Sequence, residues 1–194
     1  MKNTKFTNEQ LIKLNNLQDL QINNGIWLIP SLRIAYPNLV NFRKEKNYYD
    51  CSFLVNKDNK KLEDQLQKAI LSFMASECKD VENVYNPIRN QDEKYDGFEN
   101  GGVMFTASSS YKIKCFSSKK EIISCEEVYG GMWCFASVKP YIYGTDRKGV
   151  GFSLRSIMKI ADDNKFGGNS IVNDFKEVDI KKFSSLTEDA SVIF

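Results

Sequence analysis

Along one stretch of the sequence, aromatic and basic residues alternate with small apolar residues. This pattern is the clearest indication of a binding function. From position 133 to 143, most odd-numbered residues are rings or cations, while several residues between them are small and apolar. Successive side chains of a β-strand point to opposite faces, so the rings and the cation share one face of a predicted strand. That face carries Trp133, Phe135, Lys139, Tyr141 and Tyr143. The next predicted strand adds Arg155 and Lys159, and residues 132–160 hold five basic residues against one acid.

Planar rings beside cations are what a single-stranded nucleic acid requires. Unpaired bases stack on aromatic side chains for about 1–3 kcal/mol each, and Lys and Arg contact the phosphates. We therefore predict a surface for single-stranded nucleic acid on this face. The alternative is that Trp133 and Phe135 fill the core while Lys139 keeps an outer strand soluble. A second basic run, with Lys112 and Lys114, either extends the same groove or protects an exposed edge strand.

The sequence lacks the residue types that many catalytic sites need. The chain has no His, which excludes Ser-His-Asp triads, Cys-His pairs and His-ligated zinc. Its five cysteines form no CxxC motif, and we interpret them as small buried hydrophobes. We expect no enzyme activity, no cofactor and no metal site. Three acidic motifs that could otherwise hold Mg²⁺ are interpreted as solvated surface, namely Glu77-Cys78-Lys79, Glu126-Glu127 and Asp162-Asp163.

Length and composition fit one packed domain with short appendages. The 194 residues are 42% hydrophobic and 27% charged, and the net charge of +2 alone favours neither nucleic acid nor an acidic partner. An odd number of cysteines without an apolar signal segment predicts a cytoplasmic protein. No apolar run approaches the roughly 18 residues that a membrane span needs, so no membrane partner is expected.

The predicted elements place the rings and cations on a mainly β domain with helices. Thr7 and Gln10 form a capping box that begins an N-terminal helix, which we expect to end at Asn23-Asn24-Gly25. A second, long helix follows Asn59, because Leu62, Leu66, Ile70 and Met74 recur at helical spacing. Strands are predicted over 25–39, 48–56, 101–116 and the hairpin 131–162, with Pro30 and Pro37 at bends or bulges. Together these predicted strands and helices indicate an OB-like, five-stranded antiparallel Greek-key barrel with one long internal helix.

Five ordered blocks of this sequence resemble one protein family. They are SLRIAYPNL, YDCSFLVNKDNK, YDGFENGGVMFTASSSYK, VYGGMWCFASVKPYIYGTDRKGVGFSLRSIMKI and FGGNSIVNDF. Together they are similar to the phage-encoded single-stranded-DNA-binding proteins with an OB fold. The resemblance implies a non-catalytic protein that coats single-stranded DNA during phage DNA replication or recombination. It also implies functional positions at Arg33, Tyr36 and Pro37, at 129–133 and at 149–152.

Three regions are predicted: a helical extension over 1–25, an OB-fold domain for single-stranded DNA over 26–173, and an acidic, flexible tail over 174–194. The tail has five acids and three bases, and Glu188 and Asp189 precede a terminal Phe194. We expect it to compete with DNA and to offer Phe194 to replication or recombination proteins. The N-terminal helix could serve self-association into a homo-oligomer. The alternative function is a protein-interaction or virion-associated module that reuses an OB-like barrel.

Overall fold

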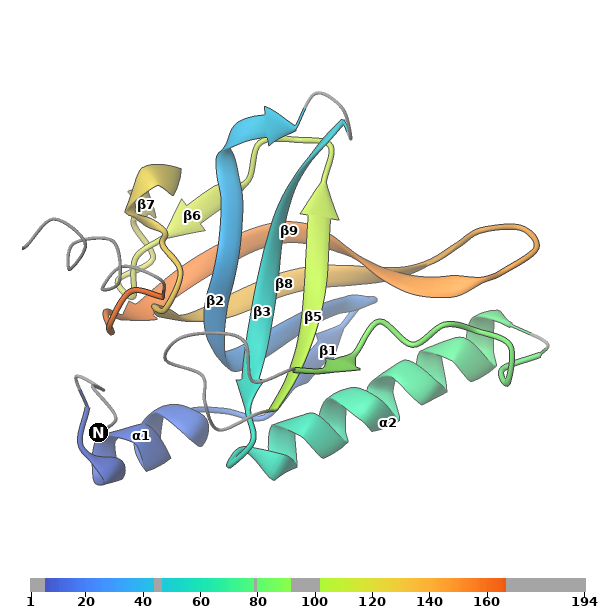
Figure 1. The fold of residues 1–194 in the computed structure, drawn as a ribbon, viewed down its shortest axis with the longest axis horizontal. Helices are drawn as coiled ribbons and strands as arrows, with labels where there is room; N and C mark the ends of the chain where they lie inside the picture. The colour runs from blue at the N-terminus through green and yellow to red at the C-terminus, as the bar shows by residue number, and fades with distance from the viewer. Residues whose placement is uncertain (1–5, 44–46, 79, 92–101, 167–194) are drawn as a thin grey trace, which may run out of the picture.

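The computed structural model describes residues 6–43, 47–78, 80–91 and 102–166. Five strands form a closed barrel in the order β5-β3-β2-β8-β9, and β9 pairs back onto β5 (Figure 1). The predicted OB-like barrel is confirmed, with one seam that differs from the antiparallel expectation because β5 and β9 are parallel. The barrel strands are β2 (Ile26–Arg43), β3 (Tyr48–Asn56), β5 (Gly102–Ser109), β8 (Trp133–Tyr143) and β9 (Gly149–Ala161).

Strand β2 is long enough to pair with β8 and with β3, and it bends where its register shifts. Its first part pairs with β8 and its later part with β3. The register shifts beside Pro30, beside Pro37 and again between Asn38 and Arg43. At the first two shifts Ser31 and Tyr36 have φ angles of 56° and 48°. The bulges predicted at the two prolines are therefore present, and they let one strand curve around the barrel.

The N-terminal segment contains a shorter helix than predicted, followed by a strand. Helix α1 (Asn8–Asn15) begins with the predicted capping box between Thr7 and Gln10. Strand β1 (Gln21–Asn23) then pairs with the start of β2. The prediction that Asn24-Gly25 ends the helix was wrong, because both residues have positive φ and form a two-residue hairpin turn between β1 and β2.

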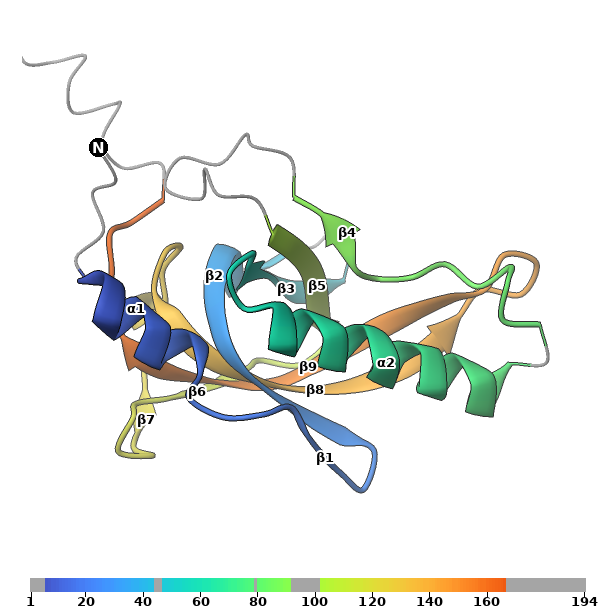
Figure 2. The same cartoon turned by 90° about the horizontal axis from the view of Figure 1, so that it is seen from below.

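Helix α2 (Lys60–Glu77) is the long internal helix that the apolar spacing predicted. The Asn59 side chain caps it by accepting a hydrogen bond from the backbone N–H of Leu62. Its apolar face buries Leu62, Leu66, Ile70 and Met74. The helix lies along one end of the barrel, as the two views show (Figures 1 and 2). It therefore closes the core at that end.

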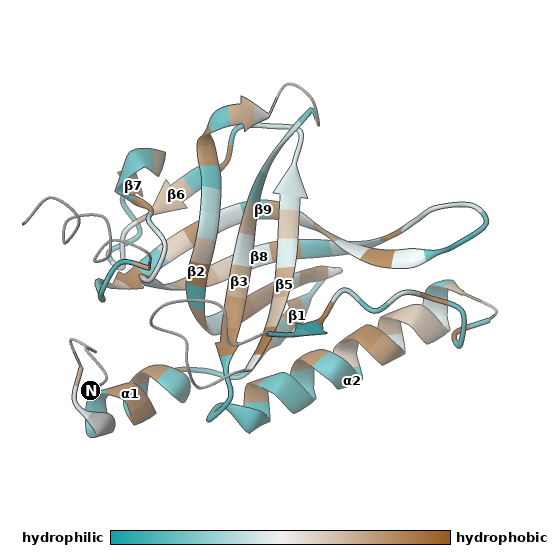
Figure 3. Ribbon diagram, in the orientation of Figure 1, coloured by the Kyte–Doolittle hydropathy of each residue, from teal (hydrophilic) through white to brown (hydrophobic). Residues whose placement is uncertain are grey.

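The core fills the barrel with aromatic and aliphatic side chains. Phe105 lies 5.3 Å from Phe53 and 5.2 Å from Phe152, and Phe152 lies 5.6 Å from Trp27 (ring centroids). All five cysteines are buried free thiols, as their interpretation as small hydrophobes predicted. Burial raises the pKa of Cys51 and of Cys134, so these thiols remain protonated. Apolar stretches run through the barrel strands, whereas the protruding part of the β8–β9 hairpin is more hydrophilic (Figure 3).

Short elements extend the sheet beyond the barrel. Strand β4 (Arg89–Asn90) pairs with β5, and β6 (Lys114–Phe116) pairs in parallel with β9. Strand β7 (Ile122–Ile123) pairs with β6, and a 3-10 helix (Cys125–Glu127) follows it. No helix in the described part of the chain has the length and apolar character to span a membrane.

Candidate nucleic-acid interface

The outer face of the β8–β9 hairpin carries most of the predicted rings. Along β8 the side chains at 134, 136, 138 and 140 are buried, and those between them are partly or fully exposed. The predicted alternation is therefore confirmed over this part of the strand. The outward side chains include Phe135, Lys139, Tyr141 and Tyr143.

Two tyrosines of β8 lie over glycines of β9. Tyr141 pairs with Gly151, and Tyr143 pairs with Gly149. A Cβ atom placed on Gly151 would lie 2.6 Å from Cζ, 2.8 Å from Oη and 2.9 Å from Cε1 of Tyr141. Three neighbouring atoms at nearly equal distances, with Cζ nearest, indicate that a ring face covers the glycine. A Cβ on Gly149 would overlap the Tyr143 ring in the same way.

These two rings present their other faces to solvent. Tyr141 is 42% exposed and Tyr143 is 43% exposed. Their ring centroids are 6.4 Å apart. A ring held against a backbone loses little rotational freedom when a second flat group stacks on it, so the pair is preorganised for stacking.

Cations from three strands lie on the same outer face. Lys139 pairs with Ser153 on β9, and directly paired residues project to the same side of a sheet. Lys114 of β6 pairs with Ser156, which in turn pairs with Ser137 of β8. Lys139, Lys114 and Arg155 are exposed, and none of them forms an ion pair within the described residues. These cations and the two tyrosines define what we call the outer hairpin face: Lys114, Lys139, Tyr141, Tyr143 and Arg155.

A β-bulge in β9 makes its second half differ from the predicted alternation. The pairing passes from Val138–Leu154 to Ser137–Ser156, which leaves Arg155 as an extra residue. Beyond the bulge the two faces exchange. Strict alternation would place Ile157 on the side of Arg155 and Lys159, but Ile157 is buried, and Met158 is half-buried opposite Phe135.

Trp133 is not part of the outer hairpin face, contrary to the prediction. Its side chain is 1% exposed, and its indole N–H donates a 3.0 Å hydrogen bond to Oδ2 of Asp163. Period-2 alternation predicted an outward ring, but the chain that follows β9 returns over this position and covers it. A fully buried ring offers no face to a base, so its place in the fold is structural.

Arg33 is likewise buried, at 5% exposure, and lies beside Trp133. Its Nε and Nη2 donate hydrogen bonds of 3.0 and 2.7 Å to the carbonyl of Gly131. Nη2 also lies 3.2 Å from Oδ2 of Asp163. Burial lowers the pKa of Arg33, and the Asp163 carboxylate opposes that shift. Nε and Nη2 of the guanidinium therefore bind groups of the protein itself.

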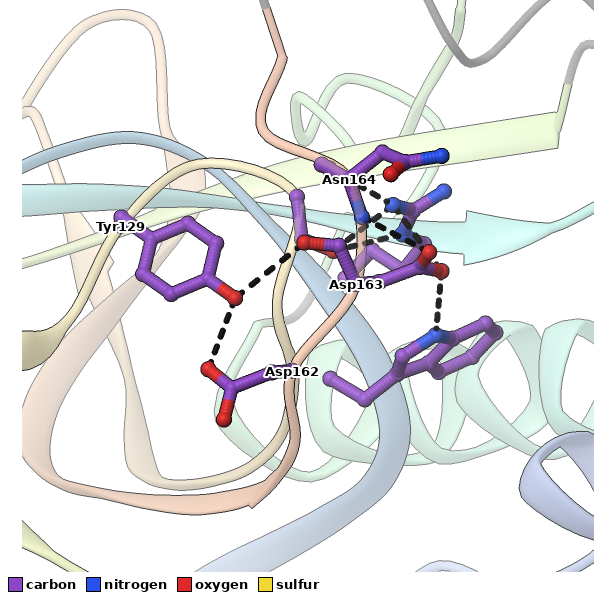
Figure 4. Close-up of polar contacts among 7 residues, drawn as sticks. Tyr129, Asp162, Asp163 and Asn164 are labelled. Atoms are coloured by element: carbon purple, nitrogen blue, oxygen red, sulfur yellow. Dashed lines mark hydrogen bonds and ion pairs between the residues drawn. The ribbon is translucent and has the colours of Figure 1, made fainter. Parts of the chain in front are cut away.

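Asp163 corrects the interpretation of Asp162-Asp163 as solvated surface. Its carboxylate receives hydrogen bonds from the Trp133 indole and, at 2.8 Å, from the backbone N–H of Asn164 (Figure 4). Together with the Arg33 ion pair, these contacts satisfy a carboxylate whose side chain is fully buried. We call Arg33, Trp133 and Asp163 the buried ion-pair cluster.

Tyr129, Asp162 and Lys159 continue this cluster toward the surface. The Tyr129 hydroxyl donates to Oδ1 of Asp162 at 2.7 Å and to the Asp163 carbonyl at 3.2 Å (Figure 4). Burial, followed by the hydrogen bond to Asp162, raises the pKa of Tyr129 to about 12. Lys159, predicted beside the rings, instead forms a 2.7 Å ion pair with Asp162.

Residues 162–166 are held closely against the barrel. The backbone N–H of Phe166 donates to the Gly130 carbonyl at 3.0 Å, and the Phe166 ring centroid lies 4.5 Å from Cζ of Arg33. Gly131 has a φ of 105°, and a Cβ there would overlap the Asn164 carbonyl. Only glycine permits this close crossing of two backbones.

The remaining predicted positions lie apart from the tyrosine pair. Tyr36 is exposed beside the second bulge of β2. Lys112 is exposed before β6 and, together with Lys114, borders a groove of about 370 Å³ beside β6 and β7. The predicted tail residues lie outside the described part of the chain: Glu188, Asp189 and Phe194.

The sequence analysis missed the pairing of rings with glycines, although a signal for it was present. A hairpin that turns between Gly144 and Gly149 places Tyr143 opposite Gly149 if the strands are in simple register. Counting two residues along each strand then places Tyr141 opposite Gly151. The buried position of Asp163 had no such signal, because it depends on the path of the chain after the sheet.

Comparisons with known proteins identify the family of this chain and relatives of its fold. Residues 28–184 match the family described as Enterobacter phage Enc34, ssDNA-binding protein. The chain belongs to this family. It is also 24% identical over 176 residues to putative protein p50 of Acyrthosiphon pisum secondary endosymbiont phage 1, covering 80% of this chain and 95% of that protein.

Two solved structures from the same phage share the fold. The single-stranded DNA-binding protein from bacteriophage Enc34 matches with a TM-score of 0.65 and 21% identity, over 76% of this chain and 87% of that one. The same protein in complex with ssDNA matches with a TM-score of 0.66 and 19% identity, over 75% of this chain and 91% of that one. Both likenesses place this barrel among the folds of phage single-stranded-DNA-binding proteins.

The buried ion-pair cluster predicts a large stability loss for Arg33→Ala. Removing the guanidinium leaves the Asp163 carboxylate buried without its cation, which costs about 3–5 kcal/mol. Urea unfolding followed by far-UV circular dichroism measures the free energy of unfolding. Arg33→Lys keeps the charge but loses the bidentate contact, so its loss is expected to be intermediate.

A matched control for this prediction is Lys61→Ala. Lys61 forms an exposed ion pair with Asp19 at 2.6 Å, and exposed pairs contribute about 0–1 kcal/mol. Equal unfolding free energies for Arg33→Ala and Lys61→Ala would contradict the structural assignment of Arg33.

Proposed function

We propose that this protein binds single-stranded DNA without catalysing a reaction, and coats it during phage DNA replication or recombination in the host cytoplasm. The observation that carries the proposal is the pair of tyrosine rings laid on glycines, beside the exposed cations of the outer hairpin face. Family membership supports the same conclusion.

Stacking on the two rings explains a preference for single strands. In a duplex each base is covered on both faces by its neighbours, so only an unpaired base can lie on Tyr141 or Tyr143. Each such contact contributes about 1–3 kcal/mol and is tolerant of sequence, because every base has a flat face. Binding is therefore expected to depend weakly on base identity.

Lys139, Arg155 and Lys114 supply the electrostatic part of the proposed interaction. They lie along the paired strands on the same side as the rings. Each neutralised phosphate releases counterions, so affinity falls as salt rises, with a slope of about −0.7 per contact for single strands. The rings and cations thus make separable contributions.

The C-terminal residues are proposed to regulate this interaction. Residues 174–194 carry more acids than bases and end in Val192-Ile193-Phe194. Glu188 and Asp189 would compete with phosphates for the cations, and Phe194 would contact replication or recombination proteins. This proposal rests on the sequence of the tail alone.

Tyr141→Ala and Tyr143→Ala are each expected to weaken binding to oligo-dT by about 5- to 150-fold, which corresponds to about 1–3 kcal/mol. Fluorescence anisotropy of a labelled oligonucleotide measures the affinity at several salt concentrations. The tyrosine variants should keep the wild-type salt slope, whereas Lys139→Ala should reduce it by about 0.7.

Two results of this experiment would speak against the proposal. If both tyrosine variants bind within twofold of the wild type, the rings do not contact bases. If the wild type prefers duplex DNA, or binds no DNA, the exposed rings instead serve a protein-interaction or virion-associated module.

Gly151→Ala tests the ring geometry without removing a ring. A Cβ at Gly151 would displace the Tyr141 ring, and the flexible side chain can move without disturbing the backbone. We expect a several-fold loss of oligo-dT affinity with little change in the unfolding midpoint. The double variant Gly151→Ala with Tyr141→Ala should bind no worse than Tyr141→Ala alone, and additive losses would contradict the shared site.

Deleting residues 184–194 is expected to tighten DNA binding at low salt. The deletion removes Glu188 and Asp189, and their competition with phosphates is strongest where screening is weak. Anisotropy titrations at low and high salt should therefore converge as salt rises. Glu188→Gln with Asp189→Asn serves as the charge control, and unchanged low-salt affinity for both variants would refute the competition.

A further inference from the structure

The segment that follows α2 is attached to the β8–β9 hairpin through Tyr85. The backbone N–H of Tyr85 donates to the Lys148 carbonyl at 2.9 Å, and the N–H of Val150 donates to the Tyr85 carbonyl at 3.0 Å. These two bonds form a parallel bridge between Tyr85 and Gly149. Figure 2 shows this segment running beside the protruding hairpin.

The bridge places the Tyr85 side chain on the outer hairpin face. Gly149 pairs with Tyr143 on one edge of β9 and with Tyr85 on the other. Directly paired residues project to the same side of a sheet, so Tyr85 projects to the side that carries Tyr143. The neighbouring Val84 is buried in the core, as alternation requires, and Tyr85 is 60% exposed.

We infer that Tyr85 is a third base-stacking ring, which extends the path of single-stranded DNA from β8 across Gly149 to the segment after α2. This inference rests on the proposed function. Tyr143 and Tyr85 are separated by two strand spacings, or about 10 Å. The Tyr143 ring lies over Gly149 and so extends toward the edge of β9 that carries Tyr85, and Gly149 places no side chain of its own between the two rings.

The Tyr85 ring has no part in holding its own segment. Both hydrogen bonds of the bridge use backbone atoms, and Val84 and Ile88 supply the buried side chains. Among the described residues no ring contact or hydrogen bond of the Tyr85 side chain is found. An exposed ring without a structural task is consistent with a ligand contact, and Tyr85→Ala can be tested in a folded protein.

The test compares Tyr85→Ala, Tyr85→Phe and Leu71→Ala with the wild type on oligo-dT of increasing length. We expect Tyr85→Ala to weaken binding to long oligonucleotides by about 5- to 100-fold, with no loss on oligonucleotides too short to reach the third ring. Its affinity should stop rising about one nucleotide earlier than that of the wild type. Tyr85→Phe should stay within about twofold of the wild type, because stacking needs the ring and not the hydroxyl.

Leu71→Ala is the control for losing an exposed side chain on the preceding helix. Leu71 is 52% exposed on α2, and its removal should leave all affinities unchanged. A direct readout is photocrosslinking of 5-iododeoxyuridine in the oligonucleotide, with the modified tyrosines identified by mass spectrometry. Modification of Tyr85 together with Tyr141 or Tyr143 would support one continuous path.

The outcomes separate this inference from the proposed function. If Tyr141→Ala and Tyr143→Ala weaken binding and Tyr85→Ala does not, the third ring is refuted and the proposed function stands. If Tyr85→Phe loses as much affinity for oligo-dT as Tyr85→Ala does, the hydroxyl and not the ring face makes the contact, which also refutes stacking. If none of the three alanine variants changes DNA binding, the proposed function fails as well.

Discussion

Strand β9 is hydrogen-bonded along both of its edges, and this constraint determines which side chains share the outer hairpin face. One edge pairs with β8 over almost its whole length, and the other pairs in turn with Tyr85, β5 and β6. Paired residues project to the same side, so the register of β9 gathers side chains from distant parts of the chain. A slip by one residue would turn the rings of β8 toward the core.

Two glycines of β9 fix the position of two exposed tyrosine rings of β8. At Gly149 and Gly151 the strand carries no side chains, so the rings of β8 can lie across it. Glycine weakens a strand, because it adds no side-chain packing and loses much conformational freedom on folding. Here the cross-strand rings supply the missing contact. Because the Tyr143 ring lies over Gly149, it extends toward the edge of β9 at which we infer that DNA reaches Tyr85.

The buried ion-pair cluster serves a different purpose from the one that its residue types indicate. An arginine beside a tryptophan in a DNA-binding family is readily interpreted as a phosphate and base contact. In this fold Arg33 and Trp133 instead hold Asp163, and thereby the chain that leaves β9, against the barrel. The pair is tolerated in the interior because hydrogen bonds satisfy the carboxylate and the guanidinium. The exposed cations are instead those of the outer hairpin face: Lys114, Lys139 and Arg155.

Local patterns of the sequence predicted a large part of the fold. Apolar spacing predicted α2, proline positions predicted the bends of β2, and alternation predicted the outward residues of β8 from Phe135 to Tyr143. Two predictions were wrong. The extra residue Arg155 forms a bulge in β9 that exchanges the faces of the residues after it, and Asn24-Gly25 form a hairpin turn where a helix end was predicted.

The sequence by itself determined the main helix and the outward side of Lys139, Tyr141 and Tyr143, because these follow from periodicities of 3.6 and 2 residues within single segments. Only the tertiary structure decided that Trp133 and Arg33 are buried and that Tyr85 joins the hairpin. Both depend on where chain segments far apart in sequence cross: residues 162–166 over β8, and residue 85 beside β9. A local pattern shows which side chains share a face, and it does not show which later segment covers that face or continues it.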